Sequence, residues 1–231
     1  MKFGIIGAGA TGLAAAYDLS LKGHKVKIYE AADYIGGHAS TFQVAGSELE
    51  KGYHHWFTND TDIVSLMAEI GLKETIEWFP SSVGTYQDGE IYKFLSPFDL
   101  MKYKPLGFIN RIKMGISSLQ IRYIKEWQKL ESISAKEWLI RNTNTEIYHA
   151  FWEPMLRGKF GEENHDKISM AWLWGKMTTR FASRKNILAK EVLGYPKGSF
   201  SHLFQQLAKT CELNSAEIFL STQIKRIRGS N

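Results

Sequence analysis

The chain has 231 residues, a formal net charge of +5 and 44% hydrophobic residues, which predicts a folded globular protein of one or two domains. Its single cysteine, Cys211, excludes an internal disulfide, and we expect an inert, buried thiol there. No stretch approaches the roughly 18 apolar residues of a membrane-spanning helix, and no recognisable nucleic-acid-binding module accompanies the charge. We therefore expect a soluble, cytoplasmic protein with no nucleic-acid partner.

Residues 1–30 have the pattern of a βαβ unit. The apolar run at 2–6 is typical of a buried parallel strand, residues 13–19 are strong helix formers, and residues 25–29 alternate polar and apolar side chains as a second strand does. Gly23, between the helix and the second strand, is expected to end the helix.

A glycine-rich turn joins the first strand to the helix, and its residues are Gly7, Ala8, Gly9, Ala10, Thr11 and Gly12. Gly7 allows a tight turn, Gly9 lets the backbone approach a pyrophosphate, and Gly12 lets the helix pack closely on the strand. Free N–H groups at the start of the helix then face the phosphate charge. Glu30 lies 18 residues after Gly12, where a carboxylate can hold a ribose hydroxyl and favours NAD or FAD over NADP. The alternative is a glycine turn that only packs a βαβ unit.

A second pair of glycines, Gly36 and Gly37, follows soon after Glu30. Glycine permits a positive φ and leaves the backbone unobstructed, so the pair predicts either a second approach to a phosphate-bearing ligand or an ordinary turn. The order of glycine turn, acidic residue and glycine pair favours the first interpretation.

These motifs together resemble the FAD-dependent oxidoreductases of the amine oxidase, protoporphyrinogen oxidase and phytoene desaturase superfamily. The residues that carry the likeness are Gly7–Gly12, Glu30-Ala31, Gly36-Gly37 and Ala39–Phe42. The resemblance implies an α/β fold, in which a Rossmann-like FAD-binding domain with an incomplete parallel sheet carries an inserted, mostly helical substrate or cap domain. It also implies FAD as the cofactor, contacted by Gly7, Ala8, Gly9, Ala10, Thr11, Gly12, Glu30, Ala31, Gly36, Gly37, His38, Ala39 and the backbone of Ile224. His38 stands where the family commonly has an arginine; a neutral imidazole can donate one hydrogen bond but brings no fixed charge.

Residues 49–57 are similar to a bacterial and archaeal protoporphyrinogen oxidase-like branch with a Tyr-His-His motif, here Tyr53, His54 and His55. The resemblance implies that this stretch passes the flavin. One of the two histidines is a candidate catalytic or substrate-contacting side chain, and the other a structural one. Adjacent side chains of an extended segment point in opposite directions, so the pair is a poor metal site and we expect no metal.

We expect residues 59–189 to form the inserted domain, and residues 1–58 and 190–231 to form the FAD-binding domain. The elements predicted for the insertion are helices at 61–71, 98–101, 106–129 and 135–141, with Ser134 and Glu137 capping the last, and short strands from 78–80 to 92–95 around a turn at Gln87-Asp88-Gly89. The elements predicted after it are a turn at 193–200, a helix through 203–208 and a strand at 217–227 that contains Ile224.

Positive charge is concentrated between Pro97 and Lys136, where eight Lys or Arg residues are accompanied by three Asp or Glu residues. Such a segment could face an anionic membrane surface or an acidic partner, or it could be a solvated helix face. Arg157 and Lys159 could attract an acidic substrate, and surface solvation is the alternative.

Aromatic residues recur in the middle of the chain, at Trp127, Trp138, Tyr148, Phe151, Trp152, Trp172 and Trp174. They predict a hydrophobic core or a wall that binds an apolar or aromatic small-molecule substrate. The function that the resemblance implies is oxidation of such a substrate with transfer of a hydride equivalent to flavin N5. The alternatives are a non-redox flavin mutase and a nucleotide-binding module without turnover. Family members continue for roughly as long again, so we expect a further C-terminal region or a second chain to complete the site.

Overall fold

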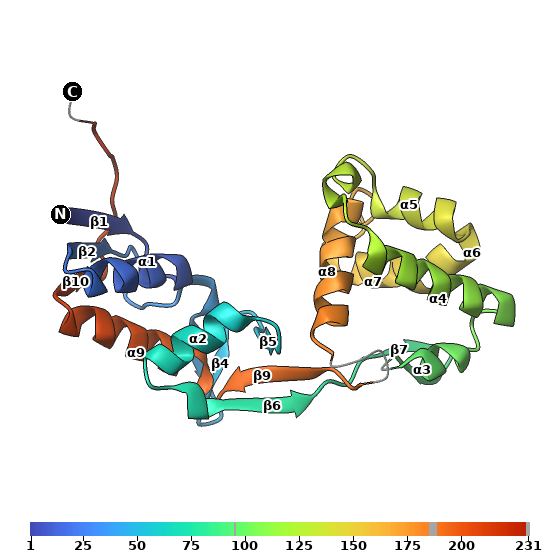
Figure 1. The fold of residues 1–231 in the computed structure, drawn as a ribbon, viewed down its shortest axis with the longest axis horizontal. Coiled ribbons are helices and arrows are strands. Elements are labelled where there is room, and N and C mark those ends of the chain that lie inside the picture. The colour runs from blue at the N-terminus through green and yellow to red at the C-terminus, as the bar shows by residue number, and fades with distance from the viewer. Residues whose placement is uncertain (95, 185–188, 230–231) are drawn as a thin grey trace. The chain divides into compact units, whose positions relative to one another are not determined.

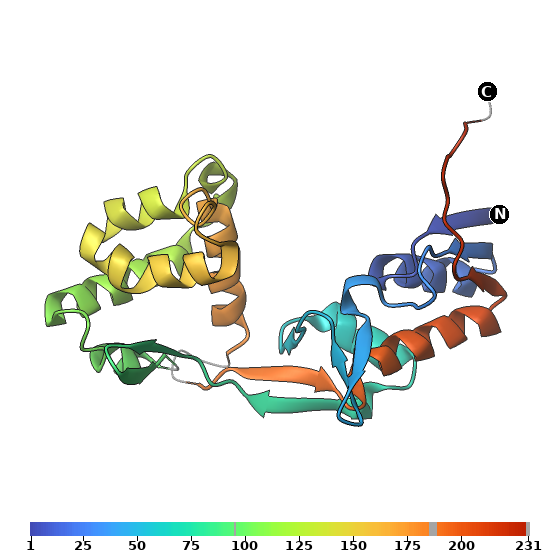
Figure 2. The ribbon, with the colours of Figure 1, turned by 180° about the vertical axis from the view of Figure 1, so that it is seen from behind.

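The computed structural model describes residues 1–94, 96–184 and 189–229, and it divides the chain into two compact units (Figures 1 and 2). The first unit comprises Met1–Trp56, Asp60–Phe79 and Leu193–Asn231, and the second comprises Phe57–Asn59 and Pro80–Val192. Leu95, which we expected to end a strand, lies outside the described residues, as do residues 230–231.

The first unit is built on a three-stranded parallel sheet in the order β1 (Lys2–Ile6), β2 (Lys25–Tyr29) and β10 (Ala216–Phe219). Helix α1 (Ala10–Leu21) links β1 to β2 and packs beside α9 (Ser199–Leu213) (Figure 1). Leu13, Ala16 and Tyr17 of α1 and the leucines and phenylalanines of α9 from Phe200 to Leu207 are buried in one core with Val26 and Ile28 of the central strand. The βαβ unit predicted for residues 1–30 is confirmed, including the helix end at Gly23, which has a φ of +74°.

The rest of the first unit surrounds this core with shorter elements. They are the 3₁₀ turn η1 (Gly37–Ala39), the hairpin β3 (Thr41–Val44) and β4 (Ser47–Glu50), and the helix α2 (Thr61–Glu69) with the 3₁₀ turn η2 (Lys73–Thr75). A second sheet has the order β5 (Trp56–Phe57), β9 (Val192–Pro196) and β6 (Ile76–Pro80), and all its residues except Phe57, Pro80 and Val192 belong to the first unit. The expected domain boundary differs here. We assigned 60–79 to the insertion, but Met67, Ile70 and Leu72 are buried in the core of the first unit.

The second unit begins with the antiparallel hairpin of β7 (Gly84–Gln87) and β8 (Glu90–Lys93). Asp88 and Gly89 at its turn have φ values of +53° and +81°, as a two-residue hairpin turn with an Asp-Gly sequence requires. The helical elements that follow are α3 (Pro97–Met101), α4 (Phe108–Tyr123), η3 (Trp127–Leu130), α5 (Ala135–Asn142), α6 (Thr145–Ile147), η4 (Tyr148–Trp152), α7 (Glu153–Phe160) and α8 (Met170–Ala182).

Most of the aromatic residues of the second unit form its core. Tyr148 and Trp152 are almost fully buried, and Trp138, Phe151, Trp172 and Trp174 pack partly buried around them. Trp127 is 37% exposed and stacks on Trp174 with 5.8 Å between ring centroids.

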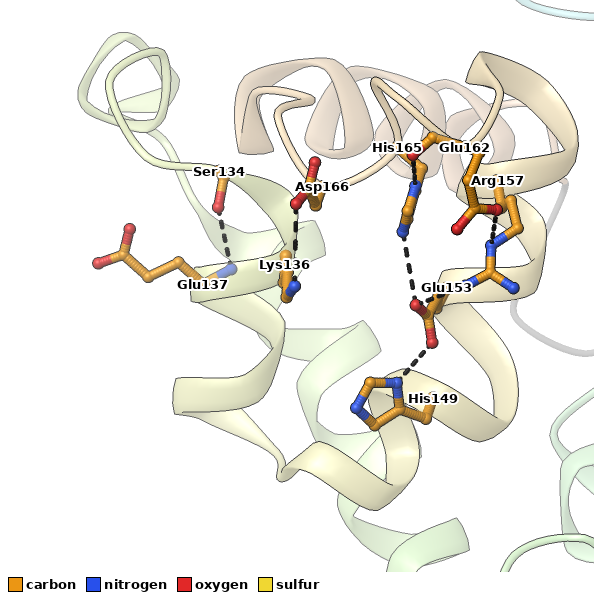
Figure 3. Close-up of polar contacts among 9 residues, drawn as sticks. All are labelled: Ser134, Lys136, Glu137, His149, Glu153, Arg157, Glu162, His165 and Asp166. Atoms are coloured by element: carbon orange, nitrogen blue, oxygen red, sulfur yellow. Dashed lines mark hydrogen bonds and ion pairs between the residues drawn. The ribbon is translucent and has the colours of Figure 1, made fainter.

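One predicted helix of the second unit is wrong in its bounds. Instead of a single helix at 106–129, α4 begins at Phe108 and ends at Tyr123, and a short 3₁₀ turn follows. Ile124 has an extended backbone, and its carbonyl accepts a hydrogen bond from the Trp174 indole at 3.1 Å. This tertiary contact holds the chain out of the helical path. At α5 the cap by Ser134 is confirmed, since its Oγ accepts from the Glu137 N–H at 3.1 Å (Figure 3), whereas the Glu137 carboxylate points away from Ser134 and does not complete a capping box.

Candidate cofactor site

Two glycines of the turn at 7–12 are required by the fold itself. Gly7 has a φ of +98°, which glycine adopts without strain, and its N–H donates to the Tyr29 carbonyl at 2.8 Å. A Cβ atom at Gly12 would lie 1.9 Å from the Gly7 carbonyl oxygen, so any side chain there would displace helix α1. Both local roles predicted for these residues, the tight turn and the close helix packing, are confirmed.

Gly9 differs from its neighbours because the fold does not need a glycine there. It has an ordinary extended backbone, with a φ of −79°, and a Cβ atom would meet only the Gly37 backbone at 3.7 Å. The space that its missing side chain leaves is therefore free for a ligand. Gly9 is also the N-terminal cap of α1, whose first turn has no acidic residue, so its N–H groups and the helix dipole favour an anion.

The second glycine pair lies directly against the first turn. The Gly36 N–H donates to the Ala8 carbonyl at 2.9 Å, and Gly9 and Gly36 form a parallel bridge. Gly36 and Gly37 have positive φ values of +102° and +56°, and a Cβ atom at Gly37 would lie 3.2 Å from Gly9 Cα. Two segments separated by more than twenty residues thus present bare backbone side by side, as a second approach to one ligand requires.

Glu30 follows the central strand and reaches the glycine turn. Its Oε2 accepts from the Ala8 N–H at 2.7 Å and its Oε1 from the Ala32 N–H at 2.9 Å. These backbone hydrogen bonds, that from Ala32 first, hold the pKa of Glu30 below its usual range, so the carboxylate is ionised at neutral pH. Each oxygen keeps a further acceptor site for a ribose hydroxyl. The hydrogen bond from Ala8 to Glu30 was not expected, and through it the Glu30 side chain also stabilises the glycine turn.

The remaining predicted cofactor residues lie around these two segments. Ala10 and Thr11 are in the first turn of α1, Ala31 follows Glu30, and His38 and Ala39 belong to the 3₁₀ turn after Gly36. Thr11, Ala31 and His38 are exposed, whereas Ala39 is buried.

The strand predicted at 217–227 is wrong in its extent. β10 ends at Phe219, and Ile224 lies beyond it on a segment without regular structure. Ser221 has a φ of +51°, and the N–H groups of Ser221 and Thr222 donate to the carbonyls of Ala32 and Glu30 at 2.8 and 2.7 Å. The structure therefore places the approach to Ile224 beside Glu30, through these bonds rather than through a continued strand.

The two candidate histidines have different neighbours. The His54 imidazole packs against Phe200 with 5.7 Å between ring centroids, and its Nδ1 bonds the Gly52 carbonyl. His55 stacks on Tyr53 at 5.7 Å and lies 6.4 Å from the Tyr195 ring. The pair does not converge on one point, as expected for adjacent residues of an extended segment, and no group of His, Cys, Asp or Glu suited to a metal is present among residues 1–94, 96–184 and 189–229.

Arg157 is already engaged by carboxylates of its own unit, which the sequence did not predict. Its Nη2 lies 2.8 Å from Glu153 Oε1 and its Nε 2.9 Å from Glu162 Oε2. Figure 3 shows His149 and His165 converging on the same Glu153 carboxylate. The Arg157 side chain is nevertheless 45% exposed, so these ion pairs lie at the surface, and attraction of an acidic substrate by Arg157 stays a prediction. Lys159 is exposed beside Trp172.

A cavity of about 380 Å³ opens beside the glycine pair in the first unit, with Ser40, Glu48 and Glu212 among its lining residues. Hydroxyl groups of Ser201 and Ser199 bond Glu48 and hold its pKa below the usual range. Two carboxylates make this cavity unsuited to a diphosphate, which the N-terminus of α1 suits better.

A second cavity, of about 480 Å³, lies within the second unit and is mostly apolar. Its walls include Phe94, Leu100, Met114, Phe151, Trp152, Met155, Met177 and Phe181. The charged residues in its lining are Arg111, Arg180 and Arg184, and no carboxylate is among the described residues that line it. The cavity can accommodate an apolar molecule, and the positive charge of its arginines disfavours a cationic ligand.

Comparisons with known proteins agree with this geometry. The model of the family described as flavin containing amine oxidoreductase matches residues 10–231. AofH of Mycobacterium tuberculosis, assigned as a flavin-containing monoamine oxidase, is 30% identical over 96% of this chain and 50% of its own length. The zeta-carotene desaturase of Arabidopsis thaliana is 26% identical over 67% of this chain and 32% of its own length.

The fold is also shared with solved structures. A protein of Exiguobacterium assigned as a protoporphyrinogen oxidase superposes with a TM-score of 0.65 at 18% identity, over 95% of this chain and 52% of that one. The chain thus spans about half the length, or less, of the relatives that it matches.

Proposed function

Because the chain belongs to the family of flavin-containing amine oxidoreductases, the cofactor is FAD, and we propose that the first unit holds it for the oxidation of an organic substrate. One observation carries the proposal. Two glycine segments meet beside an ionised carboxylate, and Gly9, the residue of the first segment that meets the second, is not needed by the fold.

In this proposal each part of the site contacts a different part of the cofactor. The N–H groups at the start of α1 and the bare backbone of Gly9 and Gly37 hold the diphosphate, with His38 as a further donor. Glu30 accepts hydrogen bonds from the ribose, and the backbone at Ile224 meets the adenine. When bound, FAD supplies the N5 atom that accepts the hydride equivalent.

The residues of the chain itself bind and orient the substrate and exclude water. We assign a substrate-contacting role to His54 or His55, since an imidazole can donate or accept a hydrogen bond near neutral pH. The structural role falls to whichever histidine can be replaced without a change in KM or kcat.

We propose an apolar or aromatic substrate rather than an amine. The second unit supports this class, because its cavity of about 480 Å³ is lined by aliphatic and aromatic side chains and by arginines. An alkylammonium group would meet repulsion from these arginines. The carotene named for one relative and the amines named for another are the two extremes that an experiment can separate.

Anaerobic reduction tests the proposal. Because the chain spans about half the length of its relatives or less, it is first extended to their full length and loaded with FAD. It is then mixed with a polyene, with a partly hydrogenated aromatic compound and with a primary amine, and bleaching of the flavin absorption is followed. Bleaching by the apolar compounds and not by the amine is expected, with free FAD as the control. Bleaching by the amine alone would refute the substrate class, and product formation without any bleaching would identify a mutase instead.

A further inference from the structure

The apolar cavity of the second unit is lined by residues from several helices. They lie on α3, α4, η4, α7 and α8 and in the segments beside them, and no helix among residues 1–94, 96–184 and 189–229 is long and apolar enough to cross a membrane. The lining runs from Val83 to Arg184, so it comes from one unit. Its few polar side chains decide which molecule the cavity can hold, because apolar walls alone distinguish poorly between apolar molecules.

Several of these polar side chains are engaged by the protein itself. The hydroxyls of Ser96 and Ser118 form hydrogen bonds with neighbours on α3 and α4. The Arg111 Nε and Nη1 atoms donate to the carbonyls of Leu106 and Met101 at 2.7 and 2.6 Å. Because a carbonyl carries no net charge, these bonds satisfy the donors of Arg111 but leave its positive charge uncompensated.

Two donors of the lining have no acceptor in the part of the chain that the structure describes. Arg180, on α8, is half-buried, and its guanidinium makes no hydrogen bond or ion pair there. Trp152, on η4, is 2% exposed, and its indole N–H is also without a partner there. A buried donor is stabilised only when it meets an acceptor, and three arginines with no carboxylate in the lining make the cavity positive.

We propose that this cavity binds an apolar or aromatic molecule that carries a carboxylate, and that the carboxylate contacts Arg180. The two oxygens of a carboxylate match two N–H groups of the planar guanidinium fork. The apolar body of the ligand then packs on side chains such as Phe151, Met155 and Phe181. That this ligand is also the molecule that is oxidised rests on the proposed function, whereas the binding itself does not.

Other ligands and roles account less well for these side chains. A neutral hydrocarbon would displace water from the Arg180 guanidinium without replacing its hydrogen bonds, which is costly for a charged group. An amine would add a further positive charge beside three arginines. The remaining alternative is that the Arg180 guanidinium stays in water and only its methylene groups contact the wall. In that case the charge at this position would not affect the binding of any ligand.

Binding of pyrene derivatives without flavin tests the proposal. The chain is titrated with pyrenebutanoate, pyrenebutanol and pyrenebutylamine, which share an apolar body and differ in charge, and the quenching of tryptophan fluorescence is followed. We expect the acid to bind at least about tenfold more tightly than the alcohol, and the amine to bind most weakly. Absence of binding by the acid would overturn the proposal, as would equal affinity for the acid and the alcohol. Neither result would prevent a neutral apolar compound from bleaching the flavin, so this failure is distinguishable from failure of the proposed function.

Matched variants locate the carboxylate. Arg180→Met removes the charge but keeps an apolar side chain, so it should weaken binding of the acid about tenfold or more and leave binding of the alcohol unchanged. Arg180→Lys keeps the charge without the planar fork and should restore part of the affinity. Lys176→Met is the control, because it removes a positive charge from an exposed position of α8 outside the lining, and it should bind the acid as the parent does. Circular dichroism confirms that each variant is folded. Equal affinity for the acid in Arg180→Met and the parent would overturn the proposal, and so would equal losses in Arg180→Met and Lys176→Met.

Discussion

Glu30 joins two functions in one side chain. Its carboxylate binds two backbone N–H groups in the free protein, at 2.7 and 2.9 Å, and it is the proposed ribose acceptor. Sequence spacing predicted the second function from the distance to Gly12. The first depends on how close the turn comes to the end of β2, which no local pattern encodes.

Replacing Glu30 should therefore lower both stability and cofactor affinity. In Glu30→Gln only the amide oxygen can accept, so one backbone N–H loses its partner, and the free energy of unfolding should fall by about 1–2 kcal/mol at neutral pH. Urea unfolding and an FAD titration measure the two effects. Glu217→Gln is the matched control, because its exposed ion pair with Lys27 at 3.3 Å should contribute little. Full FAD affinity in Glu30→Gln would remove this residue from the site.

The Glu153 cluster makes stability depend on pH in a predictable direction. Hydrogen bonding and charge from His149, then the charge of Arg157, hold the pKa of Glu153 below its usual range in the folded protein. A carboxyl group with a lowered folded-state pKa stabilises the protein at pH values above its unfolded-state pKa, and this stabilisation is lost as the pH falls through the folded-state value.

We expect Glu153→Gln to be less stable than the parent by about 1–3 kcal/mol at neutral pH, with the difference shrinking as the pH is lowered below about 4.5. Chemical unfolding followed over a pH series measures it. Glu146→Gln, at an exposed position on α6, is the control and should show no such convergence. A constant difference at every pH would contradict the ionic role of the cluster.

At the scale of elements, the glycines at the start of α1 have different roles. Gly12 is required for the packing of the helix, whereas Gly9 is proposed to leave room for the ligand. Gly12→Ala places a methyl group 1.9 Å from the Gly7 carbonyl oxygen, so it should destabilise the protein by about 2–3 kcal/mol. Gly175→Ala, within α8 and with nothing within 4 Å of its new methyl group, should stabilise it by about 0.5–1 kcal/mol. Thermal unfolding of both variants checks the contrast. Tolerance of Gly12→Ala would show that α1 can move away from β1.

Elements with a complete local signal were predicted from the sequence, and those set by distant contacts were not. The strand, turn, helix and strand of residues 1–30 and the hairpin at Asp88-Gly89 follow from local pattern and turn chemistry. The end of α4 follows instead from the bond between Trp174 and Ile124, and the end of β10 from bonds between 221–222 and 30–32. Periodicity indicates that a segment is a strand or a helix, but it does not indicate at which residue a hydrogen bond to a distant segment ends that element.

For the molecule as a whole, local sequence patterns do not indicate which core an element joins. For this reason residues 60–79 were assigned to the inserted domain, whereas they belong to the first unit. The apolar spacing at 61–71 correctly predicted a helix, yet it could not tell which core would bury Met67. Of the candidate site, the glycine turn and the glycine pair were predicted and do lie together, because their spacing follows the βαβ unit. The ion pairs of Arg157 with Glu153 and Glu162 and the hydrogen bond from Ala8 to Glu30 could not be predicted from the sequence.

An FAD titration of the Gly9 variants tests the central claim, that the space at this glycine belongs to the cofactor. A methyl group at Gly9 meets only backbone at 3.7 Å, so Gly9→Ala should unfold at the same temperature as the parent but bind FAD at least about tenfold more weakly. Gly107→Ala is the control, since Gly107 also caps a helix N-terminus and has nothing within 4 Å of an added Cβ. It should bind FAD as the parent does. Equal FAD affinity in Gly9→Ala, Gly107→Ala and the parent would contradict the account.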